Sequence, residues 1–187
     1  LEDGHVTISR ASSSLTFPAR FMLVAAMNPC PCGHLGDAVK ECICTPAQVQ
    51  RYRSRLSGPL LDRIDMHVEV PAVSMDDLGS AATGEPSAPI RDRVNQARAV
   101  QAKRYEAITT VHCNAQMRTK DLDLFCAMET PARNLLQKSI RHLGLSARAY
   151  HRIIKIARTI ADLNQAEHIT GAHLGEAVQY RRVQFDL

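Results

Sequence analysis

The chain has 187 residues, of which 45% are hydrophobic and 22% charged, so its length allows one large domain or two small ones with a core. It contains no run of 18 apolar residues, which excludes a membrane-spanning helix. The start, Leu1 to His5, lacks the Met, basic region and apolar region of a secretory signal, and it resembles a cut inside a longer protein.

The charges are divided unevenly along the chain. Residues 1–86 have 7 Lys/Arg against 10 Asp/Glu, a net charge of −3, whereas residues 87–187 have 16 against 9, a net charge of +7. We therefore expect two different units and expect the basic one to meet phosphates. A solvated basic face explains the same charges equally well.

The first part of the chain predicts strands and turns. Residues 5–17 predict a β-hairpin, because β-branched residues alternate there and a serine-rich link follows. The apolar run 20–27 predicts a buried strand that ends at Asn28, and residues 64–70 predict a second core strand. Thr45-Pro46 predicts the N-cap of a helix that runs to about Leu56.

The rest of the chain predicts a linker followed by helices. Residues 73–89 are rich in Gly, Pro, Ser and Ala and predict the linker. From residue 90 the pattern is helical, with further helices near 119–128, 131–142, 146–163 and 170–182. The helix over 146–163 has the clearest apolar face, formed by Tyr150, Ile153, Ile154, Ala157, Ile160 and Ala161. Together the segments predict an α/β class portion followed by a small helical bundle.

Four of the six cysteines lie close together in the predicted loop. Cys30, Cys32, Cys42 and Cys44 form two C-x-C pairs, and Gly33 permits the tight turn that a metal knuckle needs. Four thiolates from two short turns form a tetrahedral Zn²⁺ site, with His34 as an alternative ligand. Four protein ligands leave no open position, so we expect the metal to be structural.

Other interpretations of the cysteines stay open. C-x-C is a less specific spacing than C-x-x-C. Unliganded thiols would need a reducing compartment, and an iron–sulfur cluster uses the same ligands although nothing here indicates electron transfer. Disulfides are disfavoured because nothing indicates secretion.

Three polar side chains at element ends are candidates for nucleotide chemistry. Asn28 follows the predicted strand 20–27, where α/β sheets place ligand-contacting residues, although an ordinary Asn-Pro turn explains it as well. Arg63 either pairs with Asp62 or Asp65 or reaches a neighbouring subunit's nucleotide.

The third candidate is Arg148, in the first turn of a helix that Ser146 would cap. A cation there opposes the helix dipole at a cost of about 0.3 kcal/mol or more, unless an anion lies beside it. Arg152, Lys155 and Arg158 continue this basic side, which a solvated surface explains.

These segments together resemble the magnesium-chelatase-like branch of the AAA+ ATPases. The resemblance covers nearly the whole chain outside residues 73–89, and three blocks in this order make it specific. The blocks are LEDGHVTISRASSSLTFPARFMLVAAMNPCPCG (1–33), YRSRLSGPLLDRIDMHVEVP (52–71), and LSARAYHRIIKIARTIADL (145–163) followed by AVQYRR (177–182).

The resemblance implies a role for each candidate residue. Asn28 matches sensor 1, which polarises the attacking water beside the γ-phosphate, and Arg63 matches the arginine finger offered to the adjacent subunit. Arg148 matches sensor 2, which contacts phosphate from the helical lid. Residues 4–17 correspond to a pre-sensor hairpin facing the central pore, where Arg10 would contact nucleic acid.

The resemblance also implies a domain organisation and a missing part. Residues 1–72 would be the C-terminal part of the AAA+ core, 73–89 the linker and 90–187 the helical lid. The chain contains no G-x-x-x-x-G-K-[ST] phosphate loop and no apolar strand ending in paired acidic residues, both of which precede these blocks in the family. We therefore expect ATP and Mg²⁺ to act only in a full-length protein.

The resemblance implies a cytoplasmic motor that forms a ring, expected to be a hexamer, and handles DNA during natural transformation. The alternative within the family is a protein-remodelling or metal-insertion chaperone subunit. The basic lid and the cysteine knuckle favour DNA as the partner, and no membrane contact is expected. A free-standing zinc adaptor does not account for the three blocks.

Overall fold

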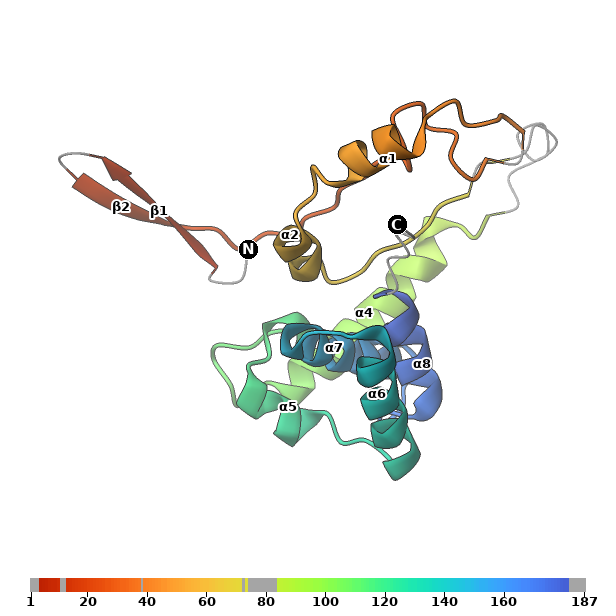
Figure 1. Ribbon diagram of the computed structural model, residues 1–187. Coiled ribbons are helices and arrows are strands. Elements are labelled where there is room, and N and C mark those ends of the chain that lie inside the picture. The colour runs from red at the N-terminus through yellow and green to blue at the C-terminus, as the bar shows by residue number, and fades with distance from the viewer. Residues whose placement is uncertain (1–3, 11–12, 38, 72, 74–83, 182–187) are drawn as a thin grey trace. The chain divides into compact units, whose positions relative to one another are not determined.

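The computed structural model describes residues 4–10, 13–37, 39–71, 73 and 84–181. They fall into two compact units, one within residues 1–64 and one within residues 65–186. The predicted linker 73–89 lies largely outside the described residues. Each unit is taken by itself below, and Figure 1 shows their elements.

The first unit opens with the predicted β-hairpin. Strands β1 (His5–Arg10) and β2 (Ser13–Pro18) pair antiparallel, with Val6 opposite Phe17 and Ile8 opposite Leu15. Because side chains alternate across a strand, these four residues form one apolar face, and the hydroxyl groups of Thr7 and Thr16, 2.9 Å apart, lie on the other. The apolar face is exposed.

Two short helices complete the first unit. Helix α1 (Pro46–Arg53) has Thr45 as its N-cap, with a reciprocal pair of hydrogen bonds between Thr45 and Gln48. The predicted helix start is confirmed, but the helix ends at Arg53 because the chain turns at Ser54. Helix α2 (Gly58–Arg63) is capped by Ser57, whose hydroxyl accepts from the Leu60 N–H.

The two predicted core strands are wrong for this structure. Residues 20–27 and 64–70 adopt no strand, and within the first of them Phe21 is 62%, Val24 83% and Met22 88% exposed. A strand requires a ladder of backbone partners on a neighbouring strand, and among the described residues neither stretch forms one; the His67 N–H donates to the Tyr180 carbonyl at 2.8 Å, but this single bond makes no ladder. The fold is therefore mostly helical, with a single two-stranded sheet among the residues described.

The second unit is a bundle of helices. Its elements are α4 (Ser87–Arg104), η1 (Asn114–Gln116), α5 (Thr119–Phe125), α6 (Thr130–Leu143), α7 (Ala147–Leu163) and α8 (Gly171–Gln179). The helices predicted from periodicity are confirmed, with ends that differ by up to three residues. None of the helices in the described ranges is long and apolar enough to cross a membrane.

Helix α7 is the centre of this bundle. It packs against α4, η1, α5 and α8, and α6 packs against α8 (Figure 1). The apolar face predicted for this helix is confirmed, because all of its residues except the half-buried Tyr150 are buried in the core. Three of these side chains are completely buried, with 0% of their surface exposed, because the neighbouring helices pack closely against them: Ile153, Ala157 and Ala161.

Local sequence signals set the ends of α7 and its neighbours. The hydroxyl of Ser146 accepts from the Ala149 N–H at 3.1 Å, which confirms it as the N-cap of α7. Gly144 ends α6 in the left-handed region at φ 59°, a conformation that favours glycine. At α8, the ring nitrogen Nδ1 of His173 accepts from the Thr170 N–H, where glutamate is the usual partner.

Candidate functional site

The four clustered cysteines come together in space. The Sγ atom of Cys30 lies 3.4 Å from that of Cys32 and 3.6 Å from that of Cys42, and the four ligand atoms, that of Cys44 included, all lie within 4.8 Å of one another. A tetrahedron of thiolates around Zn²⁺ with Zn–S bonds of about 2.3 Å has sulfur–sulfur edges of about 3.8 Å. The cluster therefore fits a metal ion.

The same distances exclude disulfides between these residues. A disulfide joins its sulfurs at about 2.05 Å, and all four cysteines are free. His34 does not join the cluster, because its Nδ1 lies 3.1 Å from the Asp37 carboxylate instead. The donor set is thus four sulfurs, which suits soft tetrahedral metals.

Backbone groups favour the thiolate form at Cys32, whereas burial and the neighbouring sulfurs of Cys30 and Cys32 raise the pKa of Cys42 to about 12. The backbone N–H of His34 donates to the Cys32 sulfur and lowers the pKa of that thiol to about 6. A turn from Cys30 to Gly33, closed by the Gly33 N–H on the Cys30 carbonyl at 3.1 Å, aims these donors at the sulfurs. Cys30 itself has 0% exposure, so solvent competes little at that position.

Helix α1 connects the end of the cysteine loop to its beginning. Its N-cap, Thr45, directly follows Cys44, and the Nε of Arg53 in its last turn donates to the Pro29 carbonyl at 3.3 Å. Pro29 directly precedes Cys30, so this hydrogen bond connects the last turn of α1 to the start of the cysteine loop. A metal bound to the cysteines would connect the start of the loop to its end.

Asn28 lies beside this cluster. It does not follow a strand, because residues 20–27 form none, and its side chain is exposed. Its amide nitrogen is the atom nearest to the open face of Gly33, at 3.7 Å from where a β-carbon would stand. The structure thus places the Asn28 side chain on the side of the loop that the hydrogen atoms of Gly33 leave open.

Arg63 is the last residue of α2. Its Nη1 donates to the carbonyl of Pro59 at 3.0 Å, one turn earlier in the same helix. The carboxylate of Asp65, one of its two expected partners, accepts from Arg152 of α7. Arg63 remains partly exposed at the end of its helix.

Arg148 is exposed in the first turn of α7, two residues after the N-cap. It belongs to the second unit, whereas Asn28 and Arg63 belong to the first. Its position at the helix start agrees with the sequence pattern, and the amide N–H groups of that turn create a positive field that attracts anions.

The basic side expected beyond Arg148 is not simply solvated. Arg158 is only 2% exposed, and Lys155 donates to the Ala115 carbonyl at 3.0 Å. Arg158 donates through Nε to Asp162 at 3.1 Å and through Nη1 to the Glu167 carbonyl at 2.6 Å. The expectation of a solvated face is therefore wrong for these two residues.

Asp162 is the hub of a buried polar network that the sequence reasoning missed. Its carboxylate accepts from Arg104 of α4, from Asn114 of η1 at 2.8 Å and from Arg158 of its own helix. Burial alone would raise the pKa of Asp162, but the hydrogen bonds from Arg104 and Asn114 outweigh burial and hold it below its usual value. One signal was present, since Asp162 is the sole acidic residue of α7 and lies four residues after Arg158.

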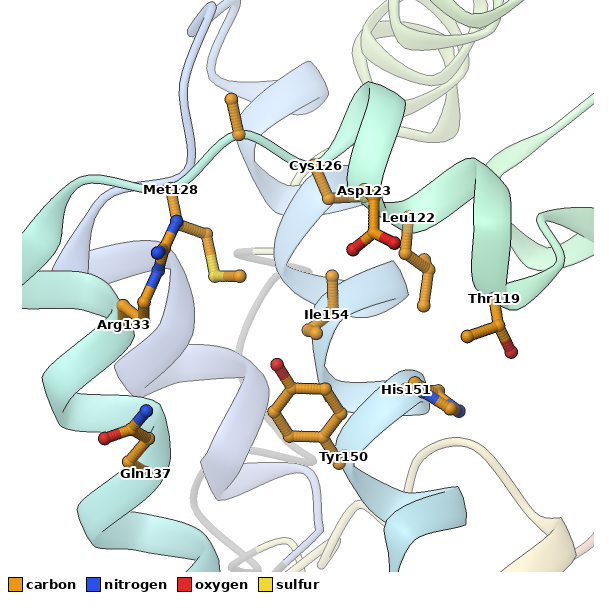
Figure 2. A pocket seen from close by; sticks show the side chains of 11 residues that line it. Thr119, Leu122, Asp123, Cys126, Met128, Arg133, Gln137, Tyr150, His151 and Ile154 are labelled. Atoms are coloured by element: carbon orange, nitrogen blue, oxygen red, sulfur yellow. The ribbon is translucent and has the colours of Figure 1, made fainter.

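A hollow of about 470 Å³ opens between α5, α6 and α7. Figure 2 shows Tyr150 and Ile154 of α7 on one wall, Arg133 and Gln137 of α6 on another, and Asp123 of α5 above them. Arg148 is not among the residues that line it. Within this unit, the hollow is therefore separate from Arg148.

Comparison with known proteins finds family matches along both parts of the chain. A family profile described as magnesium chelatase, subunit ChlI matches residues 1–78, and one described as magnesium chelatase, subunit ChlI C-terminal matches residues 84–181. The chain is 43% identical over 182 residues to the competence protein ComM of Haemophilus influenzae, covering 97% of this chain and 34% of the relative.

Other relatives agree. The chain is 43% identical over 184 residues to the uncharacterized protein YifB of Escherichia coli K12, covering 98% of this chain and 35% of the relative. It is 35% identical over 166 residues to protein Rv2897c of Mycobacterium tuberculosis, covering 87% of this chain and 32% of the relative. The chain thus spans about a third of the length of these relatives. It belongs to the magnesium chelatase ChlI family, in the part of that family that includes ComM and YifB.

Proposed function

We propose that the chain is the sensor and lid region of a ring-forming AAA+ ATPase that couples ATP hydrolysis to work on DNA, such as helicase or branch-migration activity. The observation that carries this proposal is the 43% identity to a competence protein along 97% of the chain. In this proposal the phosphate loop and the residues that hold Mg²⁺ lie in other parts of the ATPase.

Three residues would serve the hydrolysis step. Asn28 would orient the attacking water beside the γ-phosphate, and Arg148 would contact phosphate from the lid. Arg63, at the end of α2, would reach the nucleotide of the next subunit in a ring, a hexamer in this proposal. Each role depends on the negative charge that develops on the phosphoryl group while it is transferred.

The charge distribution of the lid supports DNA as the partner. Residues 130–161, which comprise α6 and most of α7, contain seven Lys/Arg and no Asp/Glu. Within the unit, Arg152 pairs with Asp65, and Lys155 and Arg158 form hydrogen bonds to other groups of the bundle. On α6, Lys138 and Arg141 are exposed one turn apart, which is the arrangement that a phosphate backbone requires.

The test is salt-dependent binding of the complete ATPase to single-stranded or branched DNA. We expect log Kobs to fall linearly with log salt, and the variant Lys138→Gln/Arg141→Gln to lower affinity and to reduce the slope by about 1 to 2 units. The control is Arg91→Gln/Arg98→Gln, which removes two exposed charges from α4 of the same unit and should change the slope less.

The second candidate is a chaperone-type ATPase that remodels protein or inserts metal, which the family description itself favours. A flat response to salt, or no DNA binding at low salt, would support this candidate and contradict DNA handling. ATP hydrolysis stimulated by an unfolded protein but not by DNA would have the same meaning.

The metal in this proposal is a structural Zn²⁺ held by Cys30, Cys32, Cys42 and Cys44. All four positions of a tetrahedral ion would be filled by protein, which leaves none for substrate. A cluster of reduced thiolates also suits the reducing cytoplasm, which we take as the site of action.

A further inference from the structure

Residues 65–67, which we call the strap, follow helix α2 in sequence but belong to the second unit. The carboxylate of Asp65 pairs with the guanidinium of Arg152 on α7. The His67 N–H donates to the carbonyl of Tyr180, the C-cap residue of α8, at 2.8 Å. The strap is therefore attached to the helical bundle at two points, which lie two residues apart in sequence.

The side chains at these two points are largely enclosed on the bundle side. The side chain of Arg152 is only 12% exposed, although that of Asp65 is 62% exposed. Both ring nitrogens of His67 are shielded from solvent, and burial together with the nearby Arg181 lowers the pKa of the ring. At Lys155, three residues after Arg152, burial lowers the pKa of the amine and the charge of Asp65 opposes that shift. The strap therefore packs against the basic side of α7 and the end of α8.

Arg63 is bound covalently to this strap. Two residues of chain span at most about 7 Å, so the Cα atom of Arg63 cannot lie farther than that from the Cα atom of Asp65. The Arg63 side chain is also held to its own helix, because its Nη1 donates to the Pro59 carbonyl at 3.0 Å. Any group that holds Asp65 therefore limits the positions that the end of α2 and its arginine can take.

The partner of Asp65 lies on the helix that carries the other candidate arginine. Arg148 and Arg152 are four residues apart on α7, so their side chains leave the helix on the same side. A movement of α7 would carry Arg148 with it, and through Arg152 it would also pull on the strap.

We infer that Asp65 and Arg152 are positioning residues for Arg63: their ion pair ties the end of α2 to α7, so that the helix that carries Arg148 also sets the position of Arg63. The functional meaning of this inference rests on the proposed role of Arg63 in ATP hydrolysis by the next subunit. The attachment of the strap to the bundle is a separate property, and it can be measured without nucleotide.

The first experiment measures hydrogen exchange of the His67 amide in the complete ATPase without nucleotide, in peptides that cover residues 64–71. Arg152→Gln removes the ion pair from a position remote in sequence, so the intrinsic exchange rate of the amide is unchanged. We expect exchange to become several-fold faster, because the strap then leaves the bundle more often and exposes this amide. Exchange as slow as in the parent would overturn the inference.

The matched control breaks a different ion pair of the same unit. Arg93 of α4 donates to the Glu85 carboxylate at 2.8 Å, and both side chains are exposed. Glu85→Gln should leave exchange at the strap unchanged. An equal increase in Glu85→Gln and Arg152→Gln would indicate general loosening of the bundle and would also overturn the inference.

The second experiment measures ATP hydrolysis by the complete ATPase in a cycle of four proteins: with Asp65 or Asp65→Asn, and with Arg63 or Arg63→Ala. We expect Asp65→Asn to lower kcat by up to about 100-fold with little change in KM, because a small displacement of a catalytic group has an effect of this size. In the Arg63→Ala background it should lower kcat no further. Asp65→Glu, which keeps the carboxylate, should recover most of the rate.

An equal fold loss of kcat in both Arg63 backgrounds would show that Asp65 acts independently of Arg63 and would overturn the inference. Failure of the proposed function gives a different result. If Arg63→Ala leaves kcat of the parent unchanged, the role of Arg63 in hydrolysis is wrong. The exchange rates would still decide whether the ion pair attaches the strap to the bundle.

Discussion

Cys30 is the residue on which the cysteine cluster depends most, because its side chain is fully enclosed and its sulfur contacts two others. We expect about one zinc per chain, the stoichiometry of a four-thiolate site. Cys30→Ser together with Cys44→Ser should abolish it, since serine is a poor zinc ligand. Elemental analysis of protein purified without chelators is the measurement.

Cys113→Ser is the control for this prediction, because Cys113 lies in the other unit and outside the cluster. It should retain the zinc of the parent. Metal-free parent protein, or zinc retained by the double variant, would contradict the assignment of the four cysteines as ligands.

The sequence predicted which residues can bind a metal better than it predicted which side chains are buried and what they contact. The cysteine spacing predicted the cluster because ligands so close in sequence have few ways to lie apart. The burial of Arg158 could not be predicted in the same way, because two of its partners are the backbone carbonyls of Ala166 and Glu167, in the loop that follows α7.

At the scale of elements, helix α7 depends on the Asp162 network. Asp162→Ala leaves the buried guanidinium of Arg158 and the half-buried one of Arg104 without their carboxylate, so we expect the free energy of unfolding to fall by about 3–5 kcal/mol. Urea unfolding followed by circular dichroism measures the change. Asp123→Asn, at an exposed position of α5, should change it by less than about 0.5 kcal/mol.

The same carboxylate predicts how stability depends on pH. Because its pKa is depressed in the folded state, Asp162 contributes stability above its unfolded pKa of about 3.9, and the contribution is lost as pH falls through the folded pKa. Asp162→Asn should therefore show a shallower loss of stability below about pH 4 than the parent. Identical acid-side slopes would contradict this.

The elements themselves were predicted unequally, for a physical reason. Helices satisfy their own backbone hydrogen bonds, so their apolar periodicity and caps located α6, α7 and α8 closely. The hairpin was also predicted, since its two strands are neighbours in sequence. Residues 20–27 and 64–70 have the composition of strands, but a strand exists only when another segment supplies the pairing, and local sequence does not supply it.

At the scale of the whole molecule, the 187-residue chain contains no G-x-x-x-x-G-K-[ST] phosphate loop, and in our proposal it supplies only accessory parts of an ATPase. We therefore expect the 187-residue chain alone to release no phosphate from ATP above the buffer rate, because nothing cradles the β- and γ-phosphates. A phosphate-release assay is the measurement, with Asn28→Ala as the control. Turnover that disappears in Asn28→Ala would contradict the prediction.

The connection between α1 and the start of the cysteine loop has a consequence for protease sensitivity. Arg51, Arg53 and Arg55 are trypsin sites at the end of a short helix that the Arg53–Pro29 hydrogen bond ties back to the cluster. Removing zinc should release this helix and speed trypsin cleavage there, while cleavage at Arg133, in the other unit, should keep its rate. A digestion pattern on a gel would then report the metal state of the loop without any assay of ATP or DNA.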